Sequence, residues 1–534
     1  MTRSAHTDSF VRDNLPPPAL WPELIFETPE LQFPERLNAT TALLDRAVAE
    51  GDGERIAIIG NNIRWTYRDL QQQVNRLANL LTGDLGVQPG NRVLLRGANS
   101  PWLAVCWLAV WKAGGVAVGT MPLLRAKELK QVISLGKISH ALCETSLANE
   151  LELAQIDCPE LTSISFYGNA EFEQRIAAKS DAYTAVDTAA DDPVLIAFTS
   201  GTTGVPKGCI HFHRDVIAMC EGFPRHCLKP DRDDVFIGTP PLAFTFGLGG
   251  LLCFPLWARG TAVLLEKLAP DILIKAIETH GATICVTSPT AYRQMTPLVP
   301  AHDLSRLKKC VSAGEALPVA TRDQWRAATG LQIYDGIGGT EMIHIYITSD
   351  PEHYRTGALG KPLPGYRAML VDENMQPVAA GEEGWLAIKG PVGCRYLADE
   401  RQAKYVRDGW NITGDTYHTD ADGYYYYHAR VDDIIVTSGY NVASPEVESV
   451  LLEHPAVAEC GVIGVPDADR GQILKAFVVL KSGHTGDDKM VKTLQDYVKN
   501  NAAPYKYPRA ISFVNALPRT ETGKLQRFRL KETT

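Results

Sequence analysis

Residues 198–208, with the sequence FTSGTTGVPKG, gather groups that could hold a chain of phosphates. Glycines let backbone N–H groups close around an anion, hydroxyls add donors, and Lys207 adds a positive charge. A Walker loop would end in Gly-Lys-Ser/Thr, whereas Pro206 precedes this lysine and a Gly-Cys pair follows it. The alternative is a polar surface loop, since clusters of Gly, Ser and Thr are typical of loops. The candidate triphosphate contacts are Thr199, Ser200, Gly201, Thr202, Thr203 and Lys207.

A second stretch, residues 334–341 with the sequence YDGIGGTE, also suits a nucleotide. Its glycines allow a flat ligand to lie close to the backbone, and Thr340 and Glu341 suit a phosphate and its Mg²⁺. The run lacks the G-x-G-x-x-G spacing of a Rossmann site and the acidic residue that follows such a site. We therefore expect a nucleotide contact that is not of the Rossmann type.

The elements that position these stretches alternate between helix and strand. Helical periods at residues 66–81 and 100–112 enclose an apolar run at 92–96, and the same rhythm continues from 190 to 360. This alternation predicts parallel sheets with helices on their faces. After residue 360, turn signals such as Asp422-Gly423 separate β-rich runs, which predicts hairpins and a β-barrel-like subdomain.

Beyond Arg430 the pattern indicates a second unit. A helix beginning near Pro445, strands at residues 457–465 and 476–480, a helix at 494–500 and a strand at 510–514 form an α+β set. About 100 residues are enough for a small domain. We therefore predict an α/β fold with a large N-terminal domain, residues 1–431, and a small α+β C-terminal domain, residues 432–534.

Residues 1–35 are rich in proline, which disfavours regular elements. Disorder is one alternative for this segment. However, Trp21, Phe26 and Phe33 offer apolar surface that can pack. We expect an extended arm that wraps the surface.

Composition excludes several classes of function. A net charge of -9 without a basic run argues against nucleic-acid binding. Eleven single cysteines suggest neither a zinc site nor a disulfide framework, and they fit a reducing cytoplasm. The N-terminus lacks the apolar core of a signal peptide, and the apolar window at residues 102–119 contains Lys112 and two glycines. We expect a cytoplasmic enzyme without a membrane span.

The order of these motifs resembles the adenylate-forming superfamily, which includes acyl- and aryl-CoA synthetases. FTSGTTGVPKG resembles its signature loop, and YDGIGGTE, the Thr413-Gly414-Asp415 triplet and the PRTETGK run at residues 518–524 resemble its later motifs. Matches run from Thr66 to Lys524 and so cover nearly the whole chain. The resemblance implies a mobile C-terminal domain.

The resemblance also implies individual roles. Asp335 and its neighbours would contact the adenine, Thr340 the α-phosphate, and Glu341 the metal ion. Lys524 would bridge the substrate carboxylate and the α-phosphate, while Asp432 would be the hinge. The remaining implied ATP contacts are Gly314, Glu315, Gly336, Asp415 and Arg430. The implied CoA contacts are Ser438, Gly439 and Tyr440.

The acid pocket is expected around residues 241–247, PLAFTFG. Many members of the superfamily carry histidine where this chain has Phe244. Phe244, Phe246 and the small Gly338 suit a short flat ring, because aromatic rings prefer stacked or edge-on neighbours. The alternative is that both phenylalanines belong to the core. His344 is a candidate polar contact at the far wall, or else a hydrogen-bonded structural histidine.

DGIGGTEMIHIYI, FTFGLGG and the N-terminal arm are similar to benzoate-CoA ligases, and most closely to 2-aminobenzoate-CoA ligases. This likeness implies that an aromatic acid reacts with Mg·ATP and then with CoA. Three alternatives stay open: an adenylation enzyme that loads a carrier protein, a luciferase-like oxidase, and a non-catalytic nucleotide-binding protein. A homodimer is also left open.

Overall fold

Two parallel-rich sheets form the framework that carries the predicted phosphate loop and its partners. The structure is a computed structural model that describes residues 3–199, 205–349, 352–430, 434–437, 440–467, 470–502, 504–519 and 525–532. The six-stranded sheet has the order β6-β5-β3-β4-β7-β8, parallel except for β8. Its strands are β3 (Arg92–Arg96), β4 (Val116–Thr120), β5 (His140–Glu144), β6 (Ser163–Tyr167), β7 (Pro193–Thr199) and β8 (Lys207–Phe212).

The nine-stranded sheet has the order β15-β14-β13-β12-β11-β9-β10-β1-β2. Its central strands are parallel, and antiparallel strands close both edges. The strands are β1 (Ile56–Gly60), β2 (Ile63–Thr66), β9 (Val235–Gly238), β10 (Thr261–Val263), β11 (Ile284–Thr287), β12 (Lys309–Ser312), β13 (Ile333–Gly338), β14 (Ile345–Thr348) and β15 (Lys361–Pro362). The predicted βα rhythm from residue 190 to 360 and the strand expected at 92–96 are confirmed.

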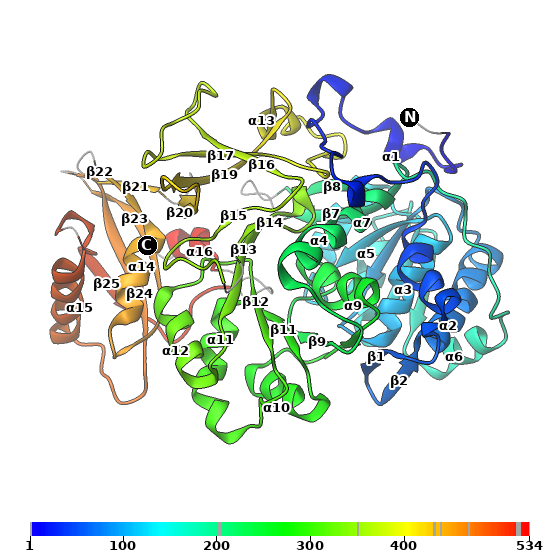
Figure 1. The fold of residues 1–534 in the computed structure, drawn as a ribbon, viewed down its shortest axis with the longest axis horizontal. Helices are drawn as coiled ribbons and strands as arrows, with labels where there is room; N and C mark the ends of the chain where they lie inside the picture. The colour runs from blue at the N-terminus through cyan, green and yellow to red at the C-terminus, as the bar shows by residue number, and fades with distance from the viewer. Residues whose placement is uncertain are drawn as a thin grey trace.

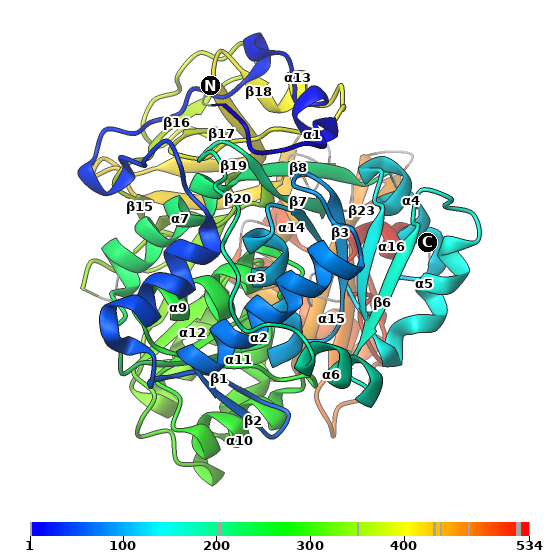
Figure 2. The ribbon, with the colours of Figure 1, turned by 90° about the vertical axis from the view of Figure 1, so that its right-hand side faces the viewer.

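Helices cover both sheets (Figures 1 and 2). The sequence sets their starts: Thr66 and Asp69 form a capping box at α2, and Ser100 accepts from Leu103 N at α3. The predicted core helix at 100–112 is confirmed, and no helix among the described residues is long and apolar enough to cross a membrane. The covering helices are α2 (Tyr67–Asn79), α3 (Pro101–Lys112), α4 (Ala126–Gly136), α5 (Ala148–Gln155), α6 (Ala170–Ala177), α7 (His213–Glu221), α9 (Phe254–Ala258), α10 (Pro270–His280), α11 (Pro289–Met295) and α12 (Val319–Thr329).

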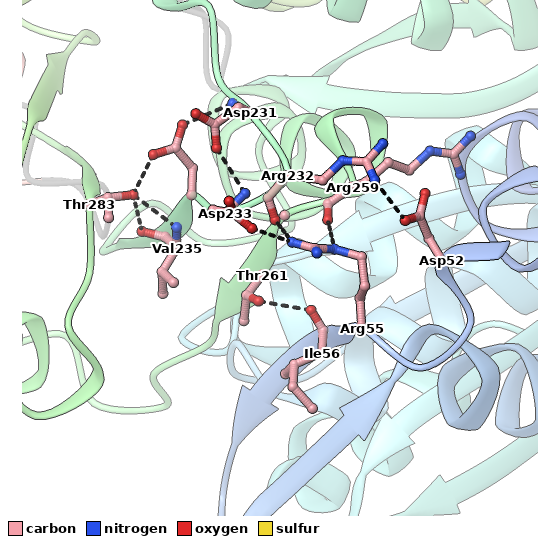
Figure 3. Close-up of polar contacts among 12 residues, drawn as sticks. Asp52, Arg55, Ile56, Asp231, Arg232, Asp233, Val235, Arg259, Thr261 and Thr283 are labelled. Carbon is pink, nitrogen blue, oxygen red and sulfur yellow. Dashed lines mark hydrogen bonds and ion pairs between the residues drawn. The ribbon is translucent and has the colours of Figure 1, made fainter. Parts of the chain in front are cut away.

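Side chains tie together the amino-terminal ends of the parallel strands in the nine-stranded sheet (Figure 3). Thr283 Oγ1 donates to Asp234 Oδ1 (2.7 Å) and accepts from Val235 N (2.9 Å). Thr261 Oγ1 donates to the carbonyl of Ile56 (2.8 Å). Ligands of open α/β sheets bind at the opposite, carboxyl ends of the strands, so this edge is fixed away from the expected site.

A five-stranded antiparallel sheet follows, as the turn signals after residue 360 predicted. The N-terminal arm contacts this sheet and the segment that leads into β7: Ile25 N donates to Gly390 O (2.9 Å), and Ala190 N donates to Glu35 O (2.9 Å). Figure 2 shows the dark blue arm beside β16, β18 and α13. The expected extended arm is confirmed. The elements are β16 (Arg367–Val371), β17 (Gly384–Lys389), α13 (Gln402–Tyr405), β18 (Val406–Arg407), β19 (Trp410–Thr419) and β20 (Tyr425–Arg430).

The C-terminal elements form their own layer of helices on a sheet, at the left of Figure 1. Buried side chains of α14 and α15 pack on one face of the sheet of β23, β24 and β25. Arg519 reaches out of this layer to Glu315 (3.2 Å) as well as to Glu459 (2.7 Å) within it. The elements are β21 (Ile434–Thr437), β22 (Tyr440–Ala443), α14 (Ser444–Glu453), β23 (Val457–Asp467), β24 (Gly471–Leu480), α15 (Asp488–Asn501), β25 (Ala510–Phe513) and α16 (Arg527–Glu532).

Candidate active site

The phosphate-loop candidate closes an antiparallel hairpin. Thr199 ends β7, Lys207 begins β8, and these two residues face each other across the pair. Lys207 therefore leads into a strand, which distinguishes the loop from a Walker loop and its following helix. Arg401 supports the loop from outside, because its guanidinium donates to the carbonyls of Val205 (3.0 Å) and Pro206 (3.2 Å).

Thr340 and Glu341 come from the nine-stranded sheet and lie beside β8 of the six-stranded sheet. They lie in a short 3₁₀ turn, Thr340–Met342, directly after β13. The carbonyl of Thr340 accepts from His211 Nε2 (2.8 Å), which comes from β8. Tyr396 links the two halves: its hydroxyl accepts from Lys207 Nζ (3.1 Å) and donates to Glu341 Oε1 (2.5 Å). The predicted metal carboxylate and phosphate cation thus share one buried partner.

Asp335 lies within β13 and is paired with Ser312, the last residue of the parallel strand β12. Its side chain is buried beside the Arg322 guanidinium (3.4 Å). Burial raises the pKa of the Asp335 carboxyl to about 6, and the positive charge of Arg322 opposes that rise. The predicted adenine contact is therefore a desolvated acceptor at the carboxyl edge of the sheet.

Neighbouring loops complete the nucleotide side. Gly314 has a φ of +91°, which lets the chain turn after β12 toward Glu315. Glu315 Oε2 accepts from Thr290 Oγ1 (2.9 Å). Asp415 and Arg430 are paired across β19 and β20, so the two predicted nucleotide contacts from the C-terminal half lie side by side in that sheet.

Aromatic side chains surround His344 and form an apolar cage. The imidazole lies edge-on to Phe254 (4.5 Å between ring centroids), tilted against Phe246 (5.6 Å) and stacked with Phe223 (6.3 Å). Gly249 gives it room, because a Cβ at that position would lie 2.4 Å from His344 Cδ2. Two of the predicted pocket residues, Phe246 and His344, are thus in contact.

Gly338 and Phe244 lie close to this cage in the chain. A Cβ on Gly338 would lie 2.7 Å from the carbonyl oxygen of His344, so only glycine fits between β13 and β14 here. Phe244 is half-buried and precedes α8 (Thr245–Leu248), where its carbonyl accepts from Leu248 N (2.8 Å). The role of Phe244 in the pocket stays a prediction.

His344 is a neutral and unsatisfied polar group. It is 4% exposed, and neither ring nitrogen makes a hydrogen bond of good geometry among the residues that the structure describes, although the Phe246 backbone lies near enough to oppose the lowering of its pKa. Burial lowers the pKa of His344 to about 3, so the imidazole is uncharged at neutral pH. A neutral imidazole carries one donor and one acceptor.

Comparison with known protein families decides the class of this chain. The AMP-binding enzyme family matches residues 44–396, and the AMP-binding enzyme C-terminal domain matches residues 446–524. The chain belongs to the AMP-binding enzyme family. This confirms the expected superfamily, its α/β fold and the enzyme class, an AMP-forming acid–thiol ligase. The expected use of ATP and CoA agrees with this family.

Individual members of the family are similar over nearly their full length. A benzoate–CoA ligase of Thauera aromatica is 36% identical, covering 94% of this chain and 97% of its own. A 4-hydroxybenzoate–CoA/benzoate–CoA ligase of Rhodopseudomonas palustris is 34% identical, covering 93% and 94%. The structure of an anthranilate CoA ligase, AuaEII, in complex with anthranoyl-AMP superposes with a TM-score of 0.89 at 33% identity, covering 95% of this chain and 99% of that chain.

Some predicted site residues of this AMP-binding enzyme lie outside the described residues. They are Ser200, Gly201, Thr202 and Thr203 of the phosphate loop, Asp432, Ser438, Gly439 and Lys524. Tyr440 begins β22. The roles of all these residues stay predictions, and so does the binding of Mg²⁺. Within the residues that are described, no group of three or more His, Cys, Asp or Glu side chains could hold a metal ion. Mg²⁺ is commonly held by one or two carboxylates together with phosphate oxygens and water.

Sequence reasoning missed several residues of the site. Tyr396 and Arg322 carried no local signal, because single tyrosines and helix arginines are common. Phe223 and Phe254 fit helical periods as ordinary core residues. Gly249 had a signal, since a glycine pair inside a helical run often marks a close approach.

Proposed function

We propose that this enzyme joins an aromatic carboxylic acid to CoA through an acyl-adenylate, and that 2-aminobenzoate is its best acid, with benzoate second. The observation that carries this proposal is His344, a buried neutral imidazole without a partner inside a cage of three phenylalanines. The cage suits a flat ring, and the imidazole nitrogen suits an amino substituent on that ring. The similarity to benzoate– and anthranilate–CoA ligases supports the same assignment.

In the first half-reaction a carboxylate oxygen attacks the α-phosphorus of Mg·ATP, and pyrophosphate leaves. Lys207 and the backbone of its loop would hold the departing phosphates, and Glu341 would hold Mg²⁺. Asp335 would accept from the adenine amino group, and Asp415 from the ribose hydroxyls. Catalysis of such a step depends mainly on positioning and on stabilising negative charge.

In the second half-reaction the CoA thiol attacks the acyl carbon and AMP leaves. We infer that the C-terminal domain, from Asp432 onward, rotates between the two steps, withdrawing Lys524 and presenting residues 438–440 to CoA. The Arg519–Glu315 ion pair supports this assignment, because it joins the two parts in one arrangement that a rotation would break. An Asp432→Pro variant should keep adenylation and lose thioester formation, whereas parallel loss of both would contradict the hinge.

The test is pyrophosphate release from Mg·ATP with benzoate, 2-aminobenzoate, 4-hydroxybenzoate and a medium-chain fatty acid, each with and without CoA. The expected result is the highest kcat/KM for 2-aminobenzoate, with multiple turnovers only when CoA is present. A preference for the fatty acid would overturn the proposed pocket. Acid-dependent adenylation without thioester formation on CoA would instead favour a carrier protein as acceptor.

A further inference from the structure

The Tyr396 hydroxyl lies between the two charged groups assigned to the phosphates and the metal. It accepts from Lys207 Nζ at 3.1 Å and donates to Glu341 Oε1 at 2.5 Å. The Lys207 ammonium also lies 4.9 Å from the centre of the Tyr396 ring. Lys207 and Glu341 form no direct ion pair among the described residues, so the phenol separates two opposite charges.

The backbone fixes the phenol in this place. Residues 394–397 pair with β8: Ile210 N donates to Arg395 O (2.8 Å), and Leu397 N donates to Gly208 O (2.8 Å). Tyr396 and Cys209 are opposite each other in this pairing. The side chain of Tyr396 therefore projects from a segment bonded directly to the strand that begins with Lys207.

Buried contacts around this segment hold it further. Tyr396 N donates to Gln402 Oε1 (2.9 Å), and the phenol ring lies edge-on to Tyr405 (5.8 Å between centroids). Arg395 forms two 3.1 Å bonds to Asp215, and neither side chain is exposed. Breaking such a buried pair is costly, so the segment has little freedom to shift.

The Tyr396 hydroxyl donates to a carboxylate, so this hydrogen bond has a charged acceptor. A hydrogen bond from a neutral donor to a carboxylate is short and strong, and it fixes the orientation of that carboxylate.

We propose that Tyr396 is a positioning residue that sets the spacing of Lys207 and Glu341 before Mg·ATP binds. With the phenol between them, the cation and the carboxylate are held apart rather than neutralising each other. Each then keeps its charge for its own ligand: Lys207 for the departing phosphates and Glu341 for Mg²⁺. This inference rests on the proposed roles of those two residues.

The test is Tyr396→Phe, which keeps the ring contacts and removes only the hydroxyl. A hydrogen bond to a charged group corresponds to a change of about 10- to 100-fold, so kcat/KM for ATP should fall by that factor at limiting Mg²⁺. The Mg²⁺ concentration for half-maximal pyrophosphate release should rise by about fivefold or more. Thioester formation from supplied aryl-adenylate and CoA should change less than about twofold, because that step uses neither group.

The matched control is Tyr292→Phe on α11, which also removes a buried hydroxyl. The Tyr292 hydroxyl donates to the carbonyls of Cys285 (2.9 Å) and Val311 (3.2 Å). This control variant should lower the thermal midpoint without raising the Mg²⁺ requirement. In an enzyme that already carries Glu341→Gln, Tyr396→Phe should raise the Mg²⁺ requirement by less than about a further threefold, because the hydroxyl acts through that carboxylate.

An unchanged Mg²⁺ requirement in a folded Tyr396→Phe enzyme would overturn the inference, as would full additivity with Glu341→Gln. Should the Phe variant not fold, Tyr396→Leu carries the same expectation and the same refuting result. Absence of pyrophosphate release by the unmodified enzyme with every acid would instead contradict the proposed function, so the two failures are distinguishable.

Discussion

Replacing His344 by leucine should remove selectivity for an amino-substituted ring while leaving the cage largely filled. Leucine is close to histidine in volume but has no polar atom. In the proposed complex the substrate amino group donates to an imidazole nitrogen that is otherwise buried without a partner. Such a hydrogen bond contributes about 1–2 kcal/mol, so kcat/KM for 2-aminobenzoate should fall about five- to thirtyfold. Benzoate makes no such bond, so its kcat/KM should change less than about threefold.

The thermal stability of His344→Leu provides an independent test of the same idea. A buried polar group without a partner costs about 1–3 kcal/mol, so removing the imidazole should leave the thermal midpoint unchanged or raise it. Phe254→Leu is the matched control, since it removes the ring that lies 4.5 Å from His344 and no polar atom. It should lower the midpoint and leave the ratio of 2-aminobenzoate to benzoate kcat/KM unchanged.

The pH dependence follows from the same burial. Because the pKa of His344 is lowered to about 3, the imidazole is neutral throughout the range from about pH 5 to pH 9. The selectivity ratio should therefore be flat over that range. Equal losses for both acids in His344→Leu, or a ratio that falls as pH drops through 6.5, would refute the reasoning.

The remaining predictions concern the nucleotide, the two-part arrangement and stability. Because burial raises the pKa of Asp335 to about 6, kcat/KM for ATP should fall as pH drops below that value, and Asp335→Asn should show a flatter profile by initial rates. Arg519→Gln removes the bond to Glu315 and should slow pyrophosphate release about three- to tenfold; equal slowing of thioester formation from supplied adenylate would contradict the assignment. Burial lowers the pKa of His6 to about 4 from an ordinary 6.5, so its stabilising contribution is complete above pH 6.5 and declines as pH falls toward 4. The thermal midpoint of His6→Gln should therefore fall less steeply with decreasing pH than that of the unmodified enzyme. An equal pH dependence in both would contradict this prediction.

The order of helices and strands was predictable because local patterns dominate it. The capping residues Thr66 and Ser100 and the apolar run that became β3 carry their signals within a few positions. The nucleotide side was predictable for a related reason. Parallel strands end at one edge of a sheet, so polar residues that directly follow β12 and β13 of the nine-stranded sheet had to meet there. The approach of β8 from the six-stranded sheet depends on how the two sheets pack, and local patterns do not carry it.

The phenylalanine cage around His344 was only partly predictable, because it joins distant segments that look like ordinary core. Phe223 follows α7, Phe254 begins α9, and His344 lies some ninety positions further along the chain. None of these residues departs from its local hydrophobic period. Their meeting depends on how the two sheets pack against shared helices, which is a tertiary property that a single sequence does not encode locally.

One short turn connects the proposed metal side of the site to the proposed acid side. Ile343 has a φ of +65° and is fully buried, and His344 N donates to Met342 O (2.8 Å) across it. This is the strained form of the γ-turn, and a left-handed conformation costs a β-branched residue about 1–2 kcal/mol. The turn separates Glu341, which points to Tyr396, from His344, which points into the phenylalanine cage. Regular helix or strand geometry would not reverse the chain within two residues, so the strain is the cost of directing Glu341 to Tyr396 and His344 to the phenylalanine cage, the two sides of the proposed site.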